Sequence, residues 1–477
     1  MLLPTFSAAI KRAAPIRPAL NLGPGWDIMS GEYVEGIHGE MILNGGMFPF
    51  TGVAGGTNSF KTGILAHWMS RILHRYVNSN SVFYDAEETF VRSRFYRLYD
   101  RLSGIPGAGE ALEHEGRFNM FDRSAMTGDQ WFDTTVKEYS DLKVEHKGAM
   151  GTTPFKNLDG TPYKYPHPTT NFADSLTEMR FRLVDARFED NDIGASESNT
   201  RDMKISNAKR VLIEDIPMYT NRGGIYVTMT AQVGKEISID GKPQKKKTTF
   251  MKQGEKLDKC PPAFYRLPNI TWIIETGAPL TGSDNKTWMY PSPYGKDTFV
   301  GDDGKNNPDL MEYSVRPLRS KGNGAGVAWS FIASQREGYL PGLTAYHFCK
   351  STNYFGLPGN NTTHECALLP GKKIGRTTIR AEINQNPKLE RALEILMEMA
   401  VMQLYWYERD PKYNIDPVDL YNTLKAKGYD WDVLLGQTRS WWTYEEDKHP
   451  LHFLSTMDLL RMYTGEYHPY WMPPLAK

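Results

Sequence analysis

The feature that most constrains the fold is a glycine-rich segment between an apolar run and a helical pattern. MFPFTGVAGGTNSFKTGIL at 47–65 begins apolar, breaks at Gly55-Gly56 and continues as a helical pattern through ILAHWMSRILHRY. Strand, glycine-rich loop, Lys-Thr pair and helix form an arrangement that binds phosphates, because N–H groups of the loop and the helix start point at the phosphate oxygens. The segment therefore predicts an α/β layer fold with a nucleotide at the loop.

The residues of this loop have separate expected roles. Lys61 can reach the β and γ phosphate oxygens, and the Thr62 hydroxyl can bind Mg²⁺. Phe60 stands where the motif GxxxxGK[ST] has its second glycine, so the match is incomplete. The alternative is a glycine turn before an amphipathic helix with an exposed lysine. The residues expected to contact the nucleotide are Gly55, Gly56, Thr57, Asn58, Ser59, Phe60, Lys61 and Thr62.

A second strand-like run ends in acidic residues. NSVFYDAEETF at 80–90 follows the helical pattern at a distance that fits one helix and one returning strand. A parallel βαβ unit brings the end of that strand beside the phosphate loop. Glu87 could there orient and deprotonate the attacking water. The alternative for Glu87 is a solvent-exposed strand end.

These segments together resemble a known family. GGTNSFKT and VFYDAEETF resemble the RecA family, and within it the UvsX-type phage recombinases, which also carry a bulky Phe before the loop lysine. ILNGGMFPF is similar to the glycine turn that leads into the same strand. The resemblance covers most of the chain from about 31 to 400. It implies an α/β fold with a RecA-like P-loop ATPase core and a mostly parallel central sheet, a short N-terminal arm, a small α-rich C-terminal region, and ATP and Mg²⁺ as cofactors.

Two further strands match motifs of that family. HPTTNFADSLTEM at 167–179 is similar to its Walker B strand, which implies that Asp174 holds the water shell of Mg²⁺. Its polar TTN departs from the Val and Ile expected in a buried parallel strand, and the alternative is an Asp that caps a following helix. IYVTMTAQVGKEI at 225–237 resembles the strand that ends in a nucleotide-sensing residue, which implies this role for Gln232. The alternative is a Gln that faces solvent.

The resemblance also implies contacts to a neighbouring subunit. YSVRPLRSKGNGAGVAWSFIASQREGYLPG at 313–342 resembles a segment whose basic residues reach the neighbour's nucleotide, and Arg319 and Lys321 match those positions. Cations supplied in trans would neutralise the developing phosphate charge. The alternative is a surface turn with exposed basic residues. For adenine, stacking is expected from Phe95 or Tyr96.

The chain after Gln232 is rich in lysine, although the whole chain has zero net charge with Lys+Arg 56 and Asp+Glu 56. In the family this position is a DNA-binding loop. Its lysines can neutralise phosphates, and Phe250 with Met251 would form an apolar tip that wedges between bases. The alternative is a solvated hairpin. The residues expected to contact DNA are Lys235, Lys242, Lys245, Lys246, Lys247, Phe250, Lys252 and Lys256, and, in a second loop near 180–200, Arg180, Arg182 and Arg187.

The chain divides into regions of different pattern. Asn386-Pro387 and Asp416-Pro417 predict helix starts, and Gly428 predicts a helix end. Gly, Pro and Thr predict inserted surface loops at 144–168 and 281–309. In the arm, Phe6-Ser7-Ala8-Ala9 fits a pattern by which some recombinases dock onto a neighbour. The expected regions are an N-terminal docking arm at 1–30, the core at 31–350, a small C-terminal domain at 351–410 and an aromatic helical tail at 411–477, whose large aromatics favour docking on the core.

Composition narrows the cellular setting. Cys260, Cys349 and Cys366 form no CxxC pair, which argues against a zinc site or a disulfide scaffold and favours a reducing cytoplasm, the host cytoplasm if the chain is phage-encoded. No stretch approaches the ~20 apolar residues of a membrane helix, so no membrane association is expected. A balanced charge argues against a histone-like DNA coat.

The expected function is that of an ATP-dependent recombinase. It would form a filament on single-stranded DNA, pair it with double-stranded DNA and exchange strands in recombination, repair and recombination-dependent replication, with a phage mediator and a single-strand-binding protein as further partners. One alternative is a hexameric DnaB-like helicase, which shares the core but usually has a substantial N-terminal domain. The other is a non-hydrolysing DNA-binding or structural filament protein, favoured by the polar TTN strand.

Overall fold

The chain forms two compact units, each described here by itself. The structure, a computed structural model, describes residues 16–146, 150–186, 200–236, 246–282, 288–292, 309–320, 324, 326–360, 362–406 and 409–475. The first unit comprises Met1–Gly46, Met150–Pro166 and Ala345–Lys477, and the second comprises Met47–Ala149 and His167–Thr344. The regions expected from sequence differ from this division, because 351–410 and 411–477 belong to one unit, together with the segment before Met47.

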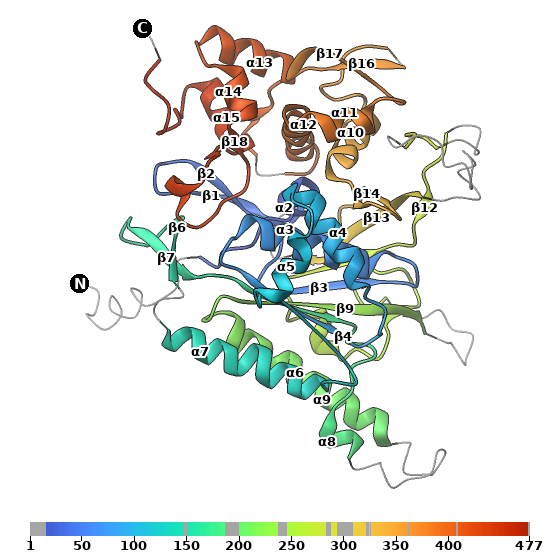
Figure 1. The fold of residues 1–477 in the computed structure, drawn as a ribbon. Helices are drawn as coiled ribbons and strands as arrows, with labels where there is room; N and C mark the ends of the chain where they lie inside the picture. The colour runs from blue at the N-terminus through green and yellow to red at the C-terminus, as the bar shows by residue number, and fades with distance from the viewer. Residues whose placement is uncertain are drawn as a thin grey trace. The chain divides into compact units, whose positions relative to one another are not determined.

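A large mixed sheet lies at the centre of the second unit (Figure 1). Within the described residues it has eleven strands in the order β15-β14-β13-β11-β3-β9-β8-β4-β5, with β10 paired to β9 and β12 to β13. The run from β11 to β5 is parallel, and the remaining pairs are antiparallel. This confirms an α/β fold with a mostly parallel central sheet. The strands are β3 (Phe50–Gly55), β4 (Asn80–Asp85), β5 (Phe118–Asp122), β8 (Thr169–Asp174), β9 (Ile225–Lys235), β10 (Glu255–Leu257), β11 (Ile270–Ile274), β12 (Ala278–Pro279), β13 (Leu310–Ser320), β14 (Trp329–Ser334) and β15 (Gly338–Tyr339).

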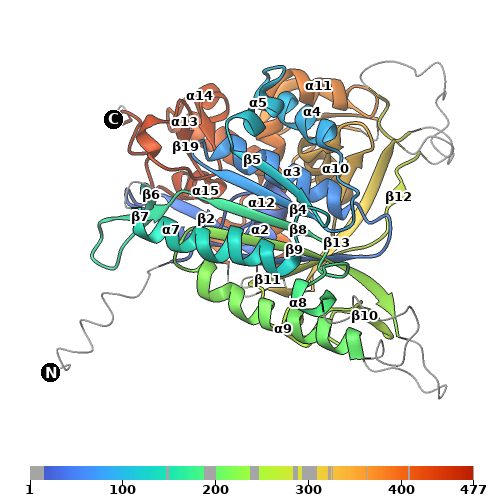
Figure 2. The ribbon, with the colours of Figure 1, turned by 60° about the horizontal axis from the view of Figure 1, so that its bottom comes forward.

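Helices cover both faces of this sheet, as Figures 1 and 2 show. One face carries α3 (Lys61–Arg75), α4 (Arg92–Ser103) and α5 (Ala108–His114). The other carries α6 (Gly128–Trp131), a π-helical turn (Phe132–Glu138), α7 (Tyr139–Glu145), α8 (Arg182–Asp185) and α9 (Arg201–Thr220). A buried cluster on the second face includes Trp131, Ile213 and Ile216 with Val227 and Met229 of β9. Burial on both faces explains the long apolar runs of the parallel strands.

The first unit is built from short hairpins and helices. In its C-terminal segment the predicted helix starts are confirmed: Asn386 accepts a hydrogen bond from the Leu389 N–H at 3.3 Å, and Asp416 accepts one from the Val418 N–H at 2.8 Å. Gly428, at φ 93°, follows the second of these helices. The elements are α2 (Pro24–Ser30), β1 (Glu32–Glu35), β2 (Met41–Asn44), β6 (Met150–Lys156), β7 (Pro162–Pro166), β16 (Thr363–Cys366), β17 (Leu369–Gly375), α11 (Ile379–Gln385), α12 (Pro387–Tyr405), α13 (Pro417–Ala426), α14 (Trp431–Gly436), β18 (Thr438–Arg439), β19 (His452–Phe453) and α15 (Thr456–Thr464); α10 (Pro341–Ser351) crosses from the second unit into the first.

The segment predicted as a surface loop at 144–168 is instead largely a β-hairpin, formed by β6 and β7. Phe155 is buried and its ring centroid lies 5.2 Å from that of Trp442. The Tyr444 hydroxyl donates to the Pro166 carbonyl at 2.8 Å. The prediction was wrong because the Gly, Pro and Thr content indicated a loop, whereas aromatic residues distant in sequence cover one side of the hairpin.

The aromatic tail packs inside the first unit. Trp442 is fully buried and its Nε1 donates to the Ala19 carbonyl at 2.8 Å. Trp431 Nε1 donates to the Leu368 carbonyl at 2.5 Å. The tail therefore shares a core with segments from both earlier parts of this unit. Among the described helices, none is long and apolar enough to cross a membrane.

Candidate active site

The phosphate loop lies at the carboxyl edge of the parallel strands. β3 ends at Gly55 and α3 begins at Lys61. In the sheet register, Gly55 pairs with Gln232 of β9 on one side and with Ile274 of β11 on the other. Ligands of open α/β sheets bind outside this edge, so the loop stands where a nucleotide would be expected.

Phe60 adopts the backbone conformation that its glycine-like position requires. It caps α3 with φ 63°, in the left-handed region that favours glycine. A methyl group at Gly63 would lie 2.6 Å from the Phe60 ring, so the absence of a side chain there lets the ring lie against the helix. The ring centroid is 5.3 Å from that of Tyr313 and 6.4 Å from that of Phe331. Aromatic packing thus offsets the backbone strain of a bulky residue at this point.

The Lys61 amine is held inside the loop. Its side chain is buried, and Nζ donates to the carbonyls of Gly55 at 3.1 Å and Gly56 at 2.8 Å. Burial lowers the pKa of Lys61, and the nearby charges of Asp174 and Glu87 oppose that effect. The alternative of an exposed lysine on an amphipathic helix is therefore wrong. Phosphate oxygens could replace the two carbonyls as acceptors without a large movement of the amine.

Asp174 lies beside Thr62 at the end of β8. It is fully buried; Oδ2 accepts a hydrogen bond from the Thr62 hydroxyl at 2.5 Å, and Oδ1 accepts one from the Thr230 hydroxyl. Burial raises the pKa of Asp174 to about 6, against the lowering effect of the two hydroxyls. No helix follows directly, because α8 begins only at Arg182, so the alternative of a helix-capping Asp is wrong.

The oxygen donors of this pair fit Mg²⁺. A hydroxyl and a carboxylate in contact are hard oxygen ligands, and Mg²⁺ at nucleotide sites takes few protein ligands with phosphates and water. In the described part of the chain no group of three or more His, Cys, Asp and Glu could hold a metal by itself. The Thr62–Asp174 pair suits a cation that arrives with the phosphates.

The polar TTN run of β8 is buried rather than exposed. Thr170 shares a hydrogen bond with the Ser81 hydroxyl, and the Asn171 amide donates to the Thr135 carbonyl at 3.3 Å. The Lys143 amine donates to the Thr169 hydroxyl at 2.8 Å. These bonds reduce the cost of burying polar groups, which explains how a central strand tolerates them.

Glu87 meets residues from the ends of two other strands. Its Oε1 accepts hydrogen bonds from the Ser175 hydroxyl at 2.5 Å and from the Gln232 amide at 3.2 Å. Its backbone N–H donates to the Asp174 carbonyl at 3.2 Å. Both side chains are half-buried and hydrogen-bonded to each other, so neither is a fully solvated strand end. Together they form a carboxylate–amide pair that can hold and deprotonate a water molecule beside the loop.

Arg319, one of the two predicted trans residues, does not join this cluster in its own chain. Arg319 on β13 lies opposite Thr271, whereas the edge at the loop is reached by Val315 opposite Ile274. Lys321 lies outside the described residues. A role toward a neighbouring subunit stays a prediction for both.

The predicted adenine contact of Phe95 needs correction. Its side chain is fully buried, and its ring centroid lies 4.5 Å from that of Phe118, so it faces the sheet. Tyr96 is only partly buried, and its hydroxyl donates to Glu113. Burial, with the Glu113 hydrogen bond, raises the pKa of Tyr96 to about 12. Stacking by Tyr96 stays a prediction.

Arg94 is the residue that the sequence analysis missed. Its guanidinium carbon lies 5.6 Å from the centroid of the Phe60 ring. Nε and Nη2 are buried and have no hydrogen-bond partner among the described residues, and burial lowers the pKa of Arg94. The sequence signal that could have identified Arg94 was helical geometry. Adjacent residues of a helix point in different directions, so Arg94 does not face the sheet when Phe95 does.

The lysine-rich segment is partly described. Lys235 ends β9, Lys246 is exposed, Lys256 lies on β10, and Lys242 and Lys245 are outside the described residues. Lys247 pairs with Glu236 at 3.1 Å, and Lys252 with Glu275 at 3.1 Å.

The apolar tip predicted for that segment is half right. Phe250 is 37% exposed, and a methyl group on Gly326 would lie 2.2 Å from its ring, so the ring packs on that glycine. Met251 is 1% exposed and belongs to the buried cluster on the sheet face that α9 covers. This contradicts its predicted place at an exposed tip.

The other predicted DNA contacts are exposed or undescribed. Arg180 and Arg182 are exposed beside α8. Arg187 and the Phe6–Ala9 motif lie outside the described residues. DNA contact by these residues stays a prediction.

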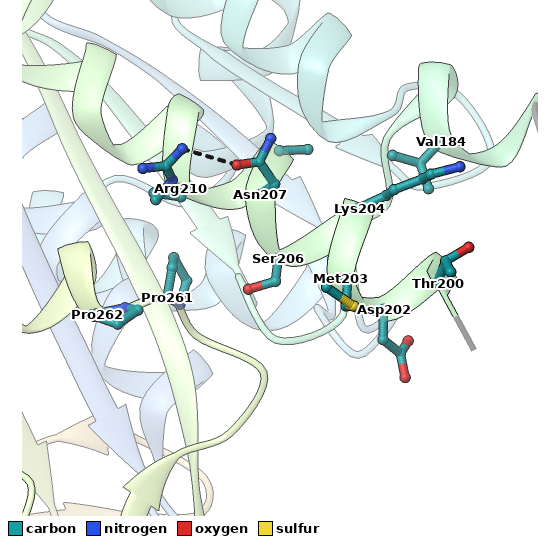
Figure 3. A pocket seen from close by; sticks show the side chains of 11 residues that line it. Val184, Thr200, Asp202, Met203, Lys204, Ser206, Asn207, Arg210, Pro261 and Pro262 are labelled. Atoms are coloured by element: carbon teal, nitrogen blue, oxygen red, sulfur yellow. Dashed lines mark hydrogen bonds between the residues drawn. The ribbon is translucent and has the colours of Figure 1, made fainter. Parts of the chain in front are cut away.

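A separate groove lies along the first half of α9 (Figure 3). Figure 3 shows Met203, Asn207 and Arg210 on the helix opposite Pro261 and Pro262, with Arg210 bonded to Asn207 at 3.0 Å. Its lining also includes Asp202 and Lys204 and none of the phosphate-loop residues. Mixed charge gives the groove no clear preference for a ligand.

The cluster at the loop thus combines a cation, a hydroxyl and two carboxylates. Lys61 and the loop N–H groups suit phosphates, Thr62 with Asp174 suits a divalent cation, and Glu87 suits a water molecule. No protein-family model and no curated protein matches the chain. A function can therefore be proposed only from this geometry and from the resemblance of the motifs.

Proposed function

We propose that the chain is a DNA-dependent ATPase of the recombinase class, which forms a filament on single-stranded DNA and promotes pairing and strand exchange with a homologous duplex. The observation that carries the proposal is the meeting of Thr62 with Asp174 and of Glu87 with Gln232 beside the Lys61 amine. The parallel run from β11 to β5 supports a RecA-like core around it.

The residues would divide the work of hydrolysis. Lys61 and the loop hold the β and γ phosphates, and Thr62 and Asp174 hold Mg²⁺, which supplies positive charge to the phosphate oxygens. Glu87 orients a water molecule whose oxygen attacks the γ-phosphorus. The bond to the bridging oxygen of ADP breaks, and the water proton passes to Glu87. Ser175 and Gln232 keep the Glu87 carboxylate in place for that transfer.

The nucleoside end of ATP is proposed to lie near Phe60 and Arg94. Asp174 and Gln232 stand on β8 and β9, and Glu87 follows the end of β4; all three strands lie on one side of the phosphate-loop strand β3. Tyr313 and Phe331, which pack on Phe60, stand on β13 and β14 on the other side. A γ-phosphate bound beside Glu87, Asp174 and Gln232 would leave the nucleoside base pointing toward Tyr313 and Phe331. There the unpartnered Arg94 nitrogens would find acceptors.

DNA binding would act on the same site through β9. That strand runs from Gln232 to Lys235 and into the lysine-rich segment, and the segment returns so that the Asp258 N–H donates to the Gln232 carbonyl at 2.8 Å. Lysines along it suit a phosphate backbone. Arg319 and Lys321 would complete a neighbour's site, which ties hydrolysis to filament assembly.

Hydrolysis with and without single-stranded DNA tests this proposal. Wild type should hydrolyse ATP with Mg²⁺ and accelerate with DNA, whereas Lys61→Ala should fall by about 10²- to 10³-fold, the typical loss of one charge-stabilising group. Lys137→Ala, which removes a half-exposed lysine of the same unit, is the matched control and should keep wild-type rates. Hydrolysis that survives in Lys61→Ala would contradict the proposal.

Assembly and strand exchange need their own measurement. With ATP and single-stranded DNA, electron microscopy should show helical filaments, and a D-loop assay should show pairing with a homologous duplex. Closed hexameric rings without pairing would instead favour a helicase.

A further inference from the structure

Lys209 is a buried lysine that forms no salt bridge with any carboxylate among the described residues. It lies on α9 and is 1% exposed. Its Nζ donates to the Thr177 carbonyl at 2.9 Å and to the Lys259 carbonyl at 3.4 Å. An ammonium group is costly to bury, and an apolar side chain would fill the same space at lower cost. The amine therefore supplies something that packing cannot, namely donors that hold two backbone carbonyls together.

The two carbonyls belong to segments with different expected roles. Thr177 follows the end of β8, where Asp174 contacts Thr62 and Ser175 contacts Glu87. Lys259 ends the lysine-rich segment, just after β10. Lys209 thus links the end of the lysine-rich segment, the expected DNA loop, to the residues just after β8. That strand carries Asp174, the expected magnesium ligand.

Gln232 is bonded to the same two segments. Its N–H donates to the Thr177 hydroxyl at 3.0 Å, and its carbonyl accepts from the Asp258 N–H at 2.8 Å. The Thr177 hydroxyl donates in turn to the Asp258 carbonyl at 3.3 Å. Through the Gln232 side chain this network ends at Glu87, at 3.2 Å. A continuous path of hydrogen bonds therefore runs from the expected catalytic carboxylate to the Lys209 amine.

We propose, on the basis of the function proposed above, that Lys209 is a positioning residue that couples the nucleotide site to the lysine-rich segment. It touches neither nucleotide nor DNA. Lys209 holds the Thr177 and Lys259 carbonyls at a fixed separation. A shift of Gln232 toward the γ-phosphate therefore also moves the end of the lysine-rich segment at Lys259. Burial raises the pKa of the neighbouring Cys260 thiol to about 12.

Lys209→Met tests this by separating basal from stimulated hydrolysis. The variant should keep basal hydrolysis near wild type, while the stimulation by saturating single-stranded DNA falls about 5- to 30-fold, in the lower part of the usual range for coupling between sites. Lys209→Arg should restore most of the stimulation, because a guanidinium can donate to both carbonyls. Lys204→Met is the matched control: it removes an exposed lysine of the same helix, α9, outside the lysine-rich segment. Its stimulation should stay close to wild type.

A structural role alone predicts a different outcome. Lys209→Met would then melt at a lower temperature and keep the wild-type stimulation ratio, which overturns the inference. If that variant does not fold, Thr177→Val removes the hydroxyl link to Gln232 and should lose the stimulation in the same way; retained stimulation there also overturns it.

Hydrogen exchange in wild type separates this inference from the proposed function. Exchange across residues 246–260 should change when MgATPγS binds. A protein that binds no nucleotide refutes the proposed function. A protein that binds nucleotide with unaltered exchange at 246–260 refutes only the coupling by Lys209.

Discussion

The phosphate loop and the lysine-rich segment both present lysines, but in opposite ways. Lys61 is buried and its amine is fixed by loop carbonyls, whereas Lys247 and Lys252 lie in exposed ion pairs with Glu236 and Glu275. Exposed pairs contribute little and exchange readily. The buried cluster is suited to chemistry that needs fixed geometry, and the exposed lysines are suited to binding a polyanion in varied positions. Substitutions should therefore act nearly all-or-none in the loop and gradually in the segment.

Glu87→Gln gives the largest expected effect on turnover. Glutamine keeps the shape and can still bond to Ser175, but it cannot accept the water proton. ATP hydrolysis should fall about 10³-fold, within the range for loss of a general base, with ATP binding retained. Steady-state rates and equilibrium binding measure the two. The neighbouring Glu88, which is exposed and pairs with Arg123 at 2.7 Å, gives the matched control Glu88→Gln. Equal losses in both variants would remove the distinction between buried and exposed carboxylates.

Asp458 tests whether burial alone makes a carboxylate functional. In the first unit, burial raises the pKa of Asp458 to about 7, although the Met41 N–H and the Ser455 hydroxyl both donate to it. A folded pKa above the unfolded value means that the folded state binds the proton more tightly. The stability associated with this group is therefore present below the unfolded pKa near 4 and is lost as the pH rises toward 7.

Asp458→Asn should abolish that pH dependence. Relative to wild type, the variant should gain about 4 kcal/mol in unfolding free energy between pH 4 and pH 8, since the folded and unfolded pKa values differ by about three units of about 1.4 kcal/mol each. Urea unfolding at both pH values measures it, and ATP hydrolysis at pH 8 should not change. A difference between the two proteins that stays constant with pH would contradict the raised pKa.

The sequence was sufficient to predict which residues come together at the phosphate loop, but it was not sufficient to predict which way every side chain points. Glu87, Asp174 and Gln232 lie at or near the carboxyl edge of parallel strands, and such edges meet at one side of the sheet, so their proximity followed from the pattern. Phe95 and Arg94 are adjacent in sequence, and only the packing of α4 decides which of them faces the loop. Met251 lies in a polar segment but is buried under the sheet.

The first unit was less predictable for a similar reason. Its core combines Ala19, Phe155 and Trp442, which come from three separate stretches of the chain. No local sequence pattern indicates that residues so far apart in the chain pack together. The β6–β7 hairpin was therefore taken for a loop, and the tail for a separate region.

Arg94→Met tests a residue at the edge of the buried phosphate-loop site. If the Arg94 nitrogens bind the nucleoside end, affinity for MgATP should fall about tenfold, the value of one hydrogen bond to a charged group. Affinity for magnesium tripolyphosphate should not change, because that ligand has no nucleoside. Isothermal titration with both ligands measures this. An equal loss for both ligands would assign Arg94 to the phosphates instead.

Single lysine substitutions in the segment give the smallest expected effects. Lys246→Ala, at an exposed position, should weaken single-stranded DNA binding a few-fold and reduce the salt dependence of log K by about 0.7, the slope for one phosphate contact of a single strand. Basal hydrolysis should be unaffected. Fluorescence anisotropy over a range of salt concentrations measures both quantities, and an unchanged slope would exclude Lys246 from the contact.

An experimental structure with MgATPγS is the most direct test. Phosphate oxygens should replace the carbonyls of Gly55 and Gly56 as acceptors of the Lys61 amine, with magnesium between the Thr62 hydroxyl and Asp174 and a water molecule at Glu87. Nucleotide bound elsewhere on the chain, or a Lys61 amine that still donates to the loop carbonyls under saturating nucleotide, would contradict the proposed site.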